Sequence, residues 1–254
     1  MNDFPFERIL NRLNIKKNDK ILVNSNILKL ISIFKDKNLP KNIIEILIKK
    51  ISPDGTLLFP AFNWDFCKGK SFDYFNTKSN TGALSNLSLS MKNFIRSKNP
   101  IYSFTIYGKD KNKISSLKHK SCFGFDSPFG YLIKNKGKNL FIDIDYKEAF
   151  TFVHVAEEKI GVNYRYIKKF EGKYTERNGK KINKNYKMYV RKINEVSKTV
   201  IDKKFDKILK NKKALIQTSF KKIKFSIIDI NVAYELMKSD IKNNSGLIRG
   251  EKIK

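Results

Sequence analysis

The stretch DKILVNSNILKLISIFKDKNLPKNIIEILIKKISPDGTLLFP, residues 19–60, carries the pattern that decides the fold. Residues 19–23 (DKILV) are typical of a buried strand, and residues 41–51 place Ile and Leu at helical spacing just after a proline. A Pro-Asp-Gly turn then leads into residues 56–59 (TLLF), a second strand that another proline ends. The order strand, helix, strand predicts an α/β fold with helices packed on a sheet.

The segments on either side extend this pattern. A long aromatic and polar loop over residues 61–81 and a second loop over residues 121–130 are typical of loops that line a site. Within residues 162–191, Asn178 and Gly179 give a hairpin signal between two polar strands. We expect further strands at 102–107 and 138–145, helices at 5–14, 82–94 and 230–242, and a helix or tight turn at 151–159. With 254 residues and no clear linker, we expect one domain, residues 1–254.

The formal net charge of +29 would ordinarily favour nucleic acid or an anionic surface as partner. However, only seven of the 53 basic residues are Arg, the side chain that typically makes bidentate hydrogen bonds to phosphates and base edges. The Lys residues are spread along the whole chain. We therefore predict no nucleic-acid partner and keep a basic nucleic-acid-binding protein as a competing hypothesis. The remaining charge suits an anionic small molecule, such as a coenzyme with several phosphates.

Cysteine content and hydropathy indicate the compartment. Cys67 and Cys122 provide neither a disulfide framework nor a metal-ligand spacing, so a reducing cytosol is expected and no metal is predicted. No N-terminal signal pattern and no run of 18 apolar residues occurs, which predicts a cytoplasmic protein without a membrane partner. The glycine-rich phosphate motifs of Rossmann and P-loop proteins are absent.

The two histidines limit any acid–base hypothesis. His119 lies among lysines and is expected at the surface. His154 lies in the apolar segment TFVHVA and precedes Glu157 and Glu158, either of which would share its face on a helix. From these residues alone, a hydrogen-bonded core histidine and a catalytic base are both open, and Cys122 stays open as an acyl-accepting nucleophile.

Seven segments carry a resemblance to a known family. They are NSN from Asn24, GTLLFPAFNWDF from Gly55, TKSNTGALS from Thr77, RSKNPIYSFTIYG from Arg96, SCFGFDSPFGYL from Ser121, TFVHVAEE from Thr151 and VNYRYIKKFEG from Val162. In this order, which covers most of the chain, they resemble the aminoglycoside 3-N-acetyltransferase family. The resemblance implies an α/β fold with a central mixed sheet and flanking helices, distinct from the GNAT superfamily.

The resemblance also implies a reaction, the direct transfer of an acyl group from acetyl-CoA, or another acyl-CoA, to the amine of an amino sugar. His154 matches the family's catalytic histidine, and Glu157 matches an acidic position that would orient it. Where many relatives carry a Glu, this chain has Phe125, and Asp126 next to it is the candidate substitute. A family member that binds CoA or sugar without catalysis is therefore a further alternative.

The implied binding residues form two sets. The first would line the coenzyme site, although each of its hydroxyls is also typical of a helix cap or a turn: Ser25, Asn26, Thr77, Ser79, Thr81 and Ser103. The second would contact the acceptor: Trp64, Asp65, Phe66, Tyr74 and Arg165. The segments FNWDFCKGK and YRYIKKFEG are most similar to the branch found with surface-polysaccharide enzymes, which implies a nucleotide-linked amino sugar as acceptor, with an aminoglycoside as the alternative. A homodimer is left open.

Overall fold

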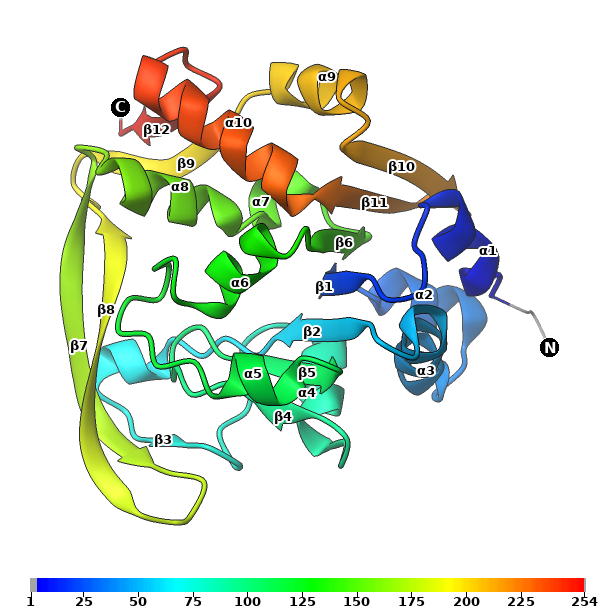
Figure 1. Cartoon of the computed structure of the whole chain (residues 1–254), viewed down its shortest axis with the longest axis horizontal. Coiled ribbons are helices and arrows are strands. Elements are labelled where there is room, and N and C mark those ends of the chain that lie inside the picture. The colour runs from blue at the N-terminus through cyan, green and yellow to red at the C-terminus, as the bar shows by residue number, and fades with distance from the viewer. Residues whose placement is uncertain (1–3, 254) are drawn as a thin grey trace.

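The computed structural model describes residues 4–253, and a seven-stranded sheet lies at its centre (Figure 1). The strand order is β10-β11-β6-β1-β2-β5-β4. The central strands β1, β2 and β6 are parallel to one another, and the strands on both sides of them are antiparallel to their neighbours. The predicted central mixed sheet is confirmed. Its strands are β1 (Lys20–Ser25), β2 (Thr56–Pro60), β4 (Ile95–Arg96), β5 (Phe104–Gly108), β6 (Lys138–Ile142), β10 (Leu215–Phe220) and β11 (Ile223–Asp229).

The two faces of the sheet bury different kinds of side chain. Along β1, Ile21 and Val23 enter a mainly aliphatic core, whereas Leu22 enters a core rich in aromatic rings on the other face. Because β1, β2 and β6 are covered on both faces, their sequences are nearly continuous runs of apolar residues. These apolar runs are the reason that the three strands can be predicted from the sequence.

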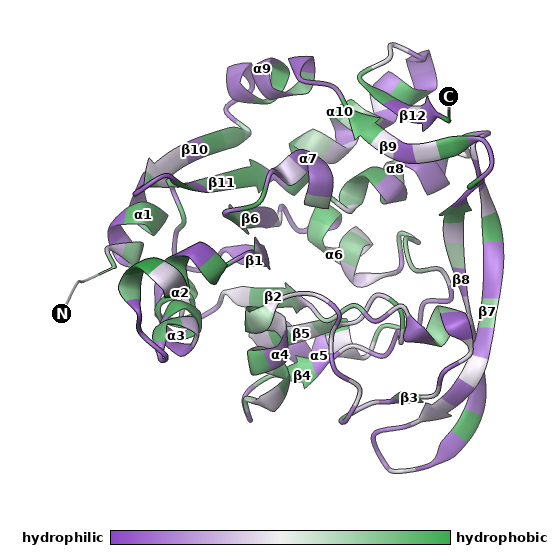
Figure 2. Ribbon diagram, turned by 180° about the vertical axis from the view of Figure 1, so that it is seen from behind, coloured by the Kyte–Doolittle hydropathy of each residue, from purple (hydrophilic) through white to green (hydrophobic). Residues whose placement is uncertain are grey.

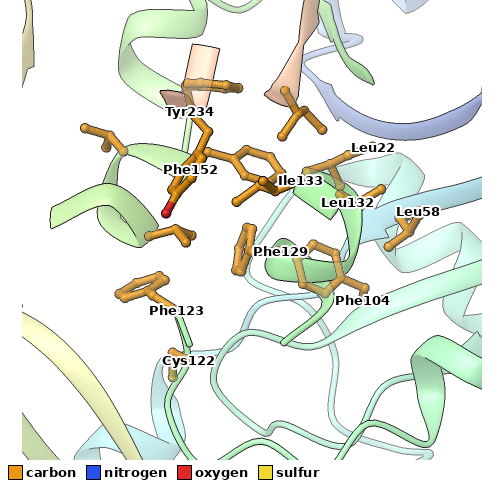
Figure 3. Close-up of a cluster of buried hydrophobic side chains, with 14 of the residues drawn as sticks. Leu22, Leu58, Phe104, Cys122, Phe123, Phe129, Leu132, Ile133, Phe152 and Tyr234 are labelled. Carbon is orange, nitrogen blue, oxygen red and sulfur yellow. The ribbon is translucent and has the colours of Figure 1, made fainter. Parts of the chain in front are cut away.

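Helices flank the sheet, as predicted, and they cover both of its faces. On the aliphatic side lie α1 (Phe6–Arg12), α2 (Leu28–Phe34), α3 (Leu39–Ile51) and α4 (Ala83–Ser90). On the aromatic side lie α6 (Pro128–Lys134), α8 (Phe152–Ile160), α9 (Lys204–Asn211) and α10 (Ile230–Asn243). Figure 3 shows Phe129 of α6, Phe152 of α8 and Tyr234 of α10 pointing into one cluster with Leu22 and Phe104 of the sheet. This packing fixes the position of α8.

The predicted hairpin is present and long. Strands β7 (Arg165–Thr175) and β8 (Lys181–Arg191) pair along their full length, and Gly179 in the turn has a φ of +83°. Figure 1 shows the pair along one side of the molecule, and Figure 2 shows β7 mostly in hydrophilic colours. The short strand β3 (Phe72–Asp73) pairs with β7. After the hairpin, β9 (Val196–Ile201) forms a separate antiparallel pair with the last strand, β12 (Ile248–Lys252).

Several expected boundaries differ from those in the structure. The helix expected at 82–94 ends at Ser90, and the strand expected at 102–107 starts at Phe104. Helix α6 begins inside the loop expected at 121–130, because Ser127 caps it and Pro128 occupies its first position. Five helical segments were not expected at all: α2, η1 (Asp65–Lys68), α5 (Lys111–Ser115), α7 (Tyr146–Ala149) and α9. Within residues 4–253, every helix is too short or too polar to span a bilayer.

Candidate active site

His154 lies in the first turn of α8, where the helix passes beside a cavity of about 450 Å³. Its helical neighbours Val153 and Val155 are buried in the aromatic core, whereas the His154 side chain keeps 24% of its surface exposed. The ring of Phe123 packs against the imidazole with the two ring centres 5.2 Å apart. The apolar side of α8 thus holds the helix in place while the imidazole lines the cavity.

The cavity is built from elements far apart in the sequence. Its walls come from the segment from α7 to the start of α8, from Arg165 at the start of β7, from the end of β8 and from β9. Tyr102 and Phe123 contribute aromatic surface to the cavity. Arg191 of β8 and Lys198 of β9 contribute positive charge. A cavity of this size with a few convergent polar groups is typical of a small-molecule site.

His119 is not at the surface, which corrects the expectation from its lysine-rich surroundings. The residue is 5% exposed, and its Nδ1 lies 2.7 Å from the carbonyl oxygen of Ser121. Burial lowers the pKa of His119, and the Ser121 carbonyl and the charge of Asp126 oppose that effect. This contact stabilises the backbone of residues 119–121, so the role of His119 is structural.

Glu157 is the carboxylate that contacts His154. Its Oε2 lies 2.7 Å from Nδ1 of the imidazole, and its side chain is fully buried. The other oxygen, Oε1, accepts hydrogen bonds from the hydroxyls of Tyr164 at 2.8 Å and Thr199 at 2.7 Å. A buried carboxylate with both oxygens occupied in this way has one fixed orientation, which in turn orients the imidazole.

Arg165 completes the surroundings of Glu157. Its Nε lies 2.7 Å from Glu157 Oε2 but lacks the angle of a hydrogen bond, so this contact is an ion pair. The two terminal nitrogens of the guanidinium donate instead to the Tyr189 carbonyl at 3.0 Å and the Thr199 hydroxyl at 2.8 Å. A buried carboxylate therefore has a buried cation beside it, as burial of a charge requires.

These contacts determine which nitrogen of His154 is free. Burial works to raise the pKa of Glu157, but the hydrogen bond from His154 and the charge of Arg165 outweigh it, so the pKa is lowered and Glu157 is a carboxylate. Burial also lowers the pKa of His154 despite the opposing effect of Glu157, with Arg165 and Arg191 lowering it further. A carboxylate only accepts hydrogen bonds, so Nδ1 of the neutral imidazole carries the proton and Nε2 has the free lone pair.

Residues 23–241 match the family model described as aminoglycoside 3-N-acetyltransferase. The chain belongs to the aminoglycoside 3-N-acetyltransferase family. It is therefore an acyltransferase of the kind that transfers an acyl group to an amine. No curated protein sequence matches the chain.

Solved structures with the aminoglycoside 3-N-acetyltransferase fold superpose over nearly the whole chain. The structure named AAC-IIIb binary with CoASH has a TM-score of 0.75 at 16% identity, covering 94% of this chain and 95% of the other. Aminoglycoside acetyltransferase AAC(3)-Xa has a TM-score of 0.77 at 16% identity, covering 93% and 91%. YokD protein from Bacillus subtilis has a TM-score of 0.73 at 22% identity, covering 94% and 97%. At these identities the likeness confirms the fold.

The three carboxylates that the sequence offers as partners of His154 have different surroundings in the structure. Glu157 contacts Nδ1, whereas Glu158, the next residue, points to the 121–127 loop and accepts a hydrogen bond from the Ser121 hydroxyl at 2.7 Å. Asp126 is exposed, and its charge acts on His119 and Glu158. No hydrogen bond or ion pair within residues 4–253 joins Asp126 to His154.

The hydroxyls expected to line the coenzyme site are largely bonded to the protein itself. Ser79 is buried and bonds to Thr81 and to the carbonyl of Phe62, and Thr81 also donates to the carbonyl of Pro60. Ser103 donates to the Ala61 carbonyl at 2.6 Å. These bonds hold the 60–82 loop in shape.

The remaining members of that set lie in turns. The Thr77 hydroxyl accepts from the backbone N–H of Asp73 at 2.8 Å, and Asn26 Oδ1 accepts from the N–H of Leu28 at the start of α2. Ser25 ends β1 and is half-buried, with Gly82 packed close to its carbonyl. None of the six expected coenzyme residues is among the described residues that line the cavity beside His154.

Of the residues expected to contact the acceptor, Arg165 lines the cavity, and the other four are not among its lining residues. Trp64 is 40% exposed, and Asp65 pairs with Lys70 at 3.2 Å. Phe66 is buried against Tyr186 of the hairpin, and the Tyr74 hydroxyl donates to the carbonyl of Arg96. Thr199 and Lys198 were not predicted, because the strand that carries them, β9, has no clear pattern in the sequence.

Proposed function

We propose that the chain, as one acyltransferase domain over residues 1–254, transfers an acetyl group from acetyl-CoA directly to the amine of an amino sugar, with His154 as general base. The observation that supports this most strongly is the contact between Nδ1 of His154 and the buried carboxylate of Glu157. It leaves Nε2 as the basic nitrogen of a side chain that lines a cavity.

In the proposed step, the amine nitrogen attacks the carbonyl carbon of the thioester. A C–N bond forms, the C–S bond breaks, and the coenzyme leaves as its thiolate. The proton that the nitrogen loses passes to Nε2 of His154 and then to the thiolate, which gives the free thiol and restores the neutral imidazole. Glu157 stabilises the imidazolium that forms in between, because it is already ionised and 2.7 Å away.

Acetyl-CoA as donor is supported by the family and by a relative whose solved structure is bound to CoASH. In this chain, we assign the coenzyme wall to the segment that contains Thr77, Ser79 and Thr81, next to Ser25 and Asn26 at the end of β1, with Ser103 behind it. Because several of these hydroxyls are bonded to loop carbonyls, their role is to shape the wall. Contact with the coenzyme would then fall to the backbone of this segment.

A nucleotide-linked amino sugar is the acceptor that we propose, in preference to an aminoglycoside. Aminoglycosides carry several ammonium groups, and a chain with a formal net charge of +29 repels them at long range. The same field attracts an acceptor that carries phosphate. Trp64, which is exposed at the protein surface, remains the aromatic side chain of the expected set that a ligand can reach for stacking.

Replacing His154 with Ala tests the reaction. The variant should lose acetyl transfer by about two to four orders of magnitude in kcat, because it lacks the group that accepts the proton. Release of CoA from acetyl-CoA should be followed with a nucleotide-linked amino sugar and with kanamycin in parallel, and acetyl-CoA binding should be measured by calorimetry.

Each result has a defined meaning. Unchanged kcat in the variant would reject His154 as the base, and wild-type protein that binds CoA without turnover would identify a non-catalytic family member. Turnover with kanamycin alone would reject the proposed acceptor.

A further inference from the structure

The cavity beside His154 is lined by more positive than negative side chains. Its cationic residues are Lys147, Arg165, Arg191 and Lys198, and its one carboxylate within the described part of the chain is that of Glu148. A single carboxylate cannot offset the several ammonium groups of an aminoglycoside. The charge of the walls therefore favours an anionic ligand.

Two of these cations are already neutralised by the protein. Arg165 pairs with Glu157, and Lys147 lies 3.2 Å from a carboxylate oxygen of Asp145 and 3.4 Å from one of Asp206. Across residues 4–253, by contrast, Arg191 and Lys198 have no carboxylate within ion-pair distance. The carboxylate of Glu251, which is opposite Lys198 in the β9–β12 pair, instead accepts from the Ser197 hydroxyl at 3.1 Å.

Of Arg191 and Lys198, Arg191 is the better placed to bind a ligand. It is half-buried at the end of β8 and lies directly opposite Arg165 of β7, so the two side chains share one face of the hairpin. Like charges in such a pair destabilise a sheet, and Glu157 neutralises only Arg165. Arg191 lines the same cavity as His154, and its charge lowers the pKa of that imidazole.

We propose that Arg191, with Lys198 at the cavity rim, forms a phosphate-binding subsite that holds the anionic part of the acceptor. A guanidinium is suited to this because its planar fork donates two parallel hydrogen bonds to phosphate. The subsite rests on the proposed function, and it accounts for an acceptor whose amine reaches His154 while its pyrophosphate is held on the β8–β9 wall.

The coenzyme also carries phosphates, so the experiment must separate the two ligands. Binding of inorganic pyrophosphate and of uridine diphosphate should be measured by calorimetry on protein already saturated with CoA. The variants are Arg191→Gln, Arg191→Lys and a matched control, Arg177→Gln, which alters an exposed arginine in the turn of the same hairpin. Thermal unfolding of each variant establishes that it is folded.

The expected result is a Kd for both probes that rises about ten- to a hundred-fold in Arg191→Gln, because a charge-assisted hydrogen bond to phosphate is lost. Arg191→Lys should retain part of the affinity, and Arg177→Gln should match the wild type. Binding of uridine diphosphate but not of pyrophosphate supports the subsite as well, with the nucleoside contributing.

Two results would overturn the subsite: neither probe binds the CoA-saturated wild type, or Arg191→Gln weakens CoA itself and leaves the probes unaffected. These results are independent of the proposed function. If Arg191 governs pyrophosphate binding but no amine is acetylated, acyl transfer is wrong and the subsite stands. If a phosphate-free amino sugar is acetylated and no pyrophosphate binds, acyl transfer stands, and both the subsite and the nucleotide-linked acceptor are wrong.

Discussion

Glu157 and Glu158 are adjacent residues of one type, yet their surroundings give them opposite properties. Burial tends to raise both pKa values, but Glu157 has His154 and Arg165 against it, and its pKa is lowered. For Glu158, burial and the negative charge of Asp126 outweigh the opposing hydrogen bond from the Ser121 hydroxyl, so its pKa is raised. One helix therefore presents an ionised carboxylate to the imidazole and a second, less acidic carboxyl group to the loop that carries Phe123.

This contrast predicts the behaviour of a matched pair of variants. Glu157→Gln should reduce kcat by about a hundred- to ten-thousand-fold, because an amide can donate to Nδ1 and so place the imidazole proton on Nε2. Glu158→Gln keeps a partner for the Ser121 hydroxyl and should change kcat by less than about ten-fold. Steady-state kinetics of acetyl transfer measure both. Similar losses in the two variants would contradict the assignment of Glu157.

At this scale, the sequence predicts residues only where partners are close along the chain. The spacing from His154 to Glu157 follows from helix geometry, and the structure shows that contact. The sequence left Glu157, Glu158 and Asp126 open, since the choice depends on the direction in which each side chain points. Thr199 lies 42 residues beyond Glu157 and shares no local pattern with it, so only the folded chain shows that contact.

At the scale of elements, strands were predictable where the sequence shows a nearly unbroken apolar run. Strand β11 is buried on both faces but is interrupted by Lys224 and Ser226, and it was not predicted. The strands β1, β2 and β6 read as apolar runs, and the β7–β8 hairpin was marked by its Asn-Gly turn. The edge strand β10 has a single fully buried residue, Leu215, and its other residues are mixed in polarity, so it gave no clear signal. The same holds for β9, and with it the cavity wall that carries Lys198 was missed.

Helix α6 was missed for a different reason. Its sequence, PFGYLIK, contains a proline and a glycine that are typical of loops. In the structure the proline takes the first helical position, where its missing N–H costs nothing, and Gly130 lies where an added Cβ would meet the backbone of Phe125. The close approach of the Phe125 backbone, which the sequence does not reveal, requires the glycine.

For the whole molecule, the formal net charge of +29 is the dominant feature. Like charges on a compact protein repel one another, and salt screens that repulsion. The same charge underlies both the competing hypothesis of nucleic-acid binding and the preference for an anionic acceptor. Affinity for nucleic acid that falls steeply with salt and shows no sequence preference would be the expected result of charge alone.

The charge predicts a stability effect that can be measured directly. The Tm should rise as NaCl is increased from low ionic strength to the physiological range, by about 2–4 °C for each kcal/mol of repulsion that is relieved. Differential scanning calorimetry at fixed pH tests this, with sucrose at matched osmolarity as a control for effects unrelated to charge. A Tm that is constant or falls with NaCl would show that the lysines are locally compensated.

The ionisation state of His154 is the point on which catalysis depends, and ¹⁵N NMR of the histidine side chains measures it. The chain has two histidines, and a His119→Gln variant assigns the signals. At neutral pH, we predict that His154 carries its proton on Nδ1, has an unprotonated Nε2, and titrates below the ordinary histidine range, because burial, Arg165 and Arg191 lower its pKa. A proton on Nε2 at neutral pH, or a raised pKa, would contradict its role as the general base.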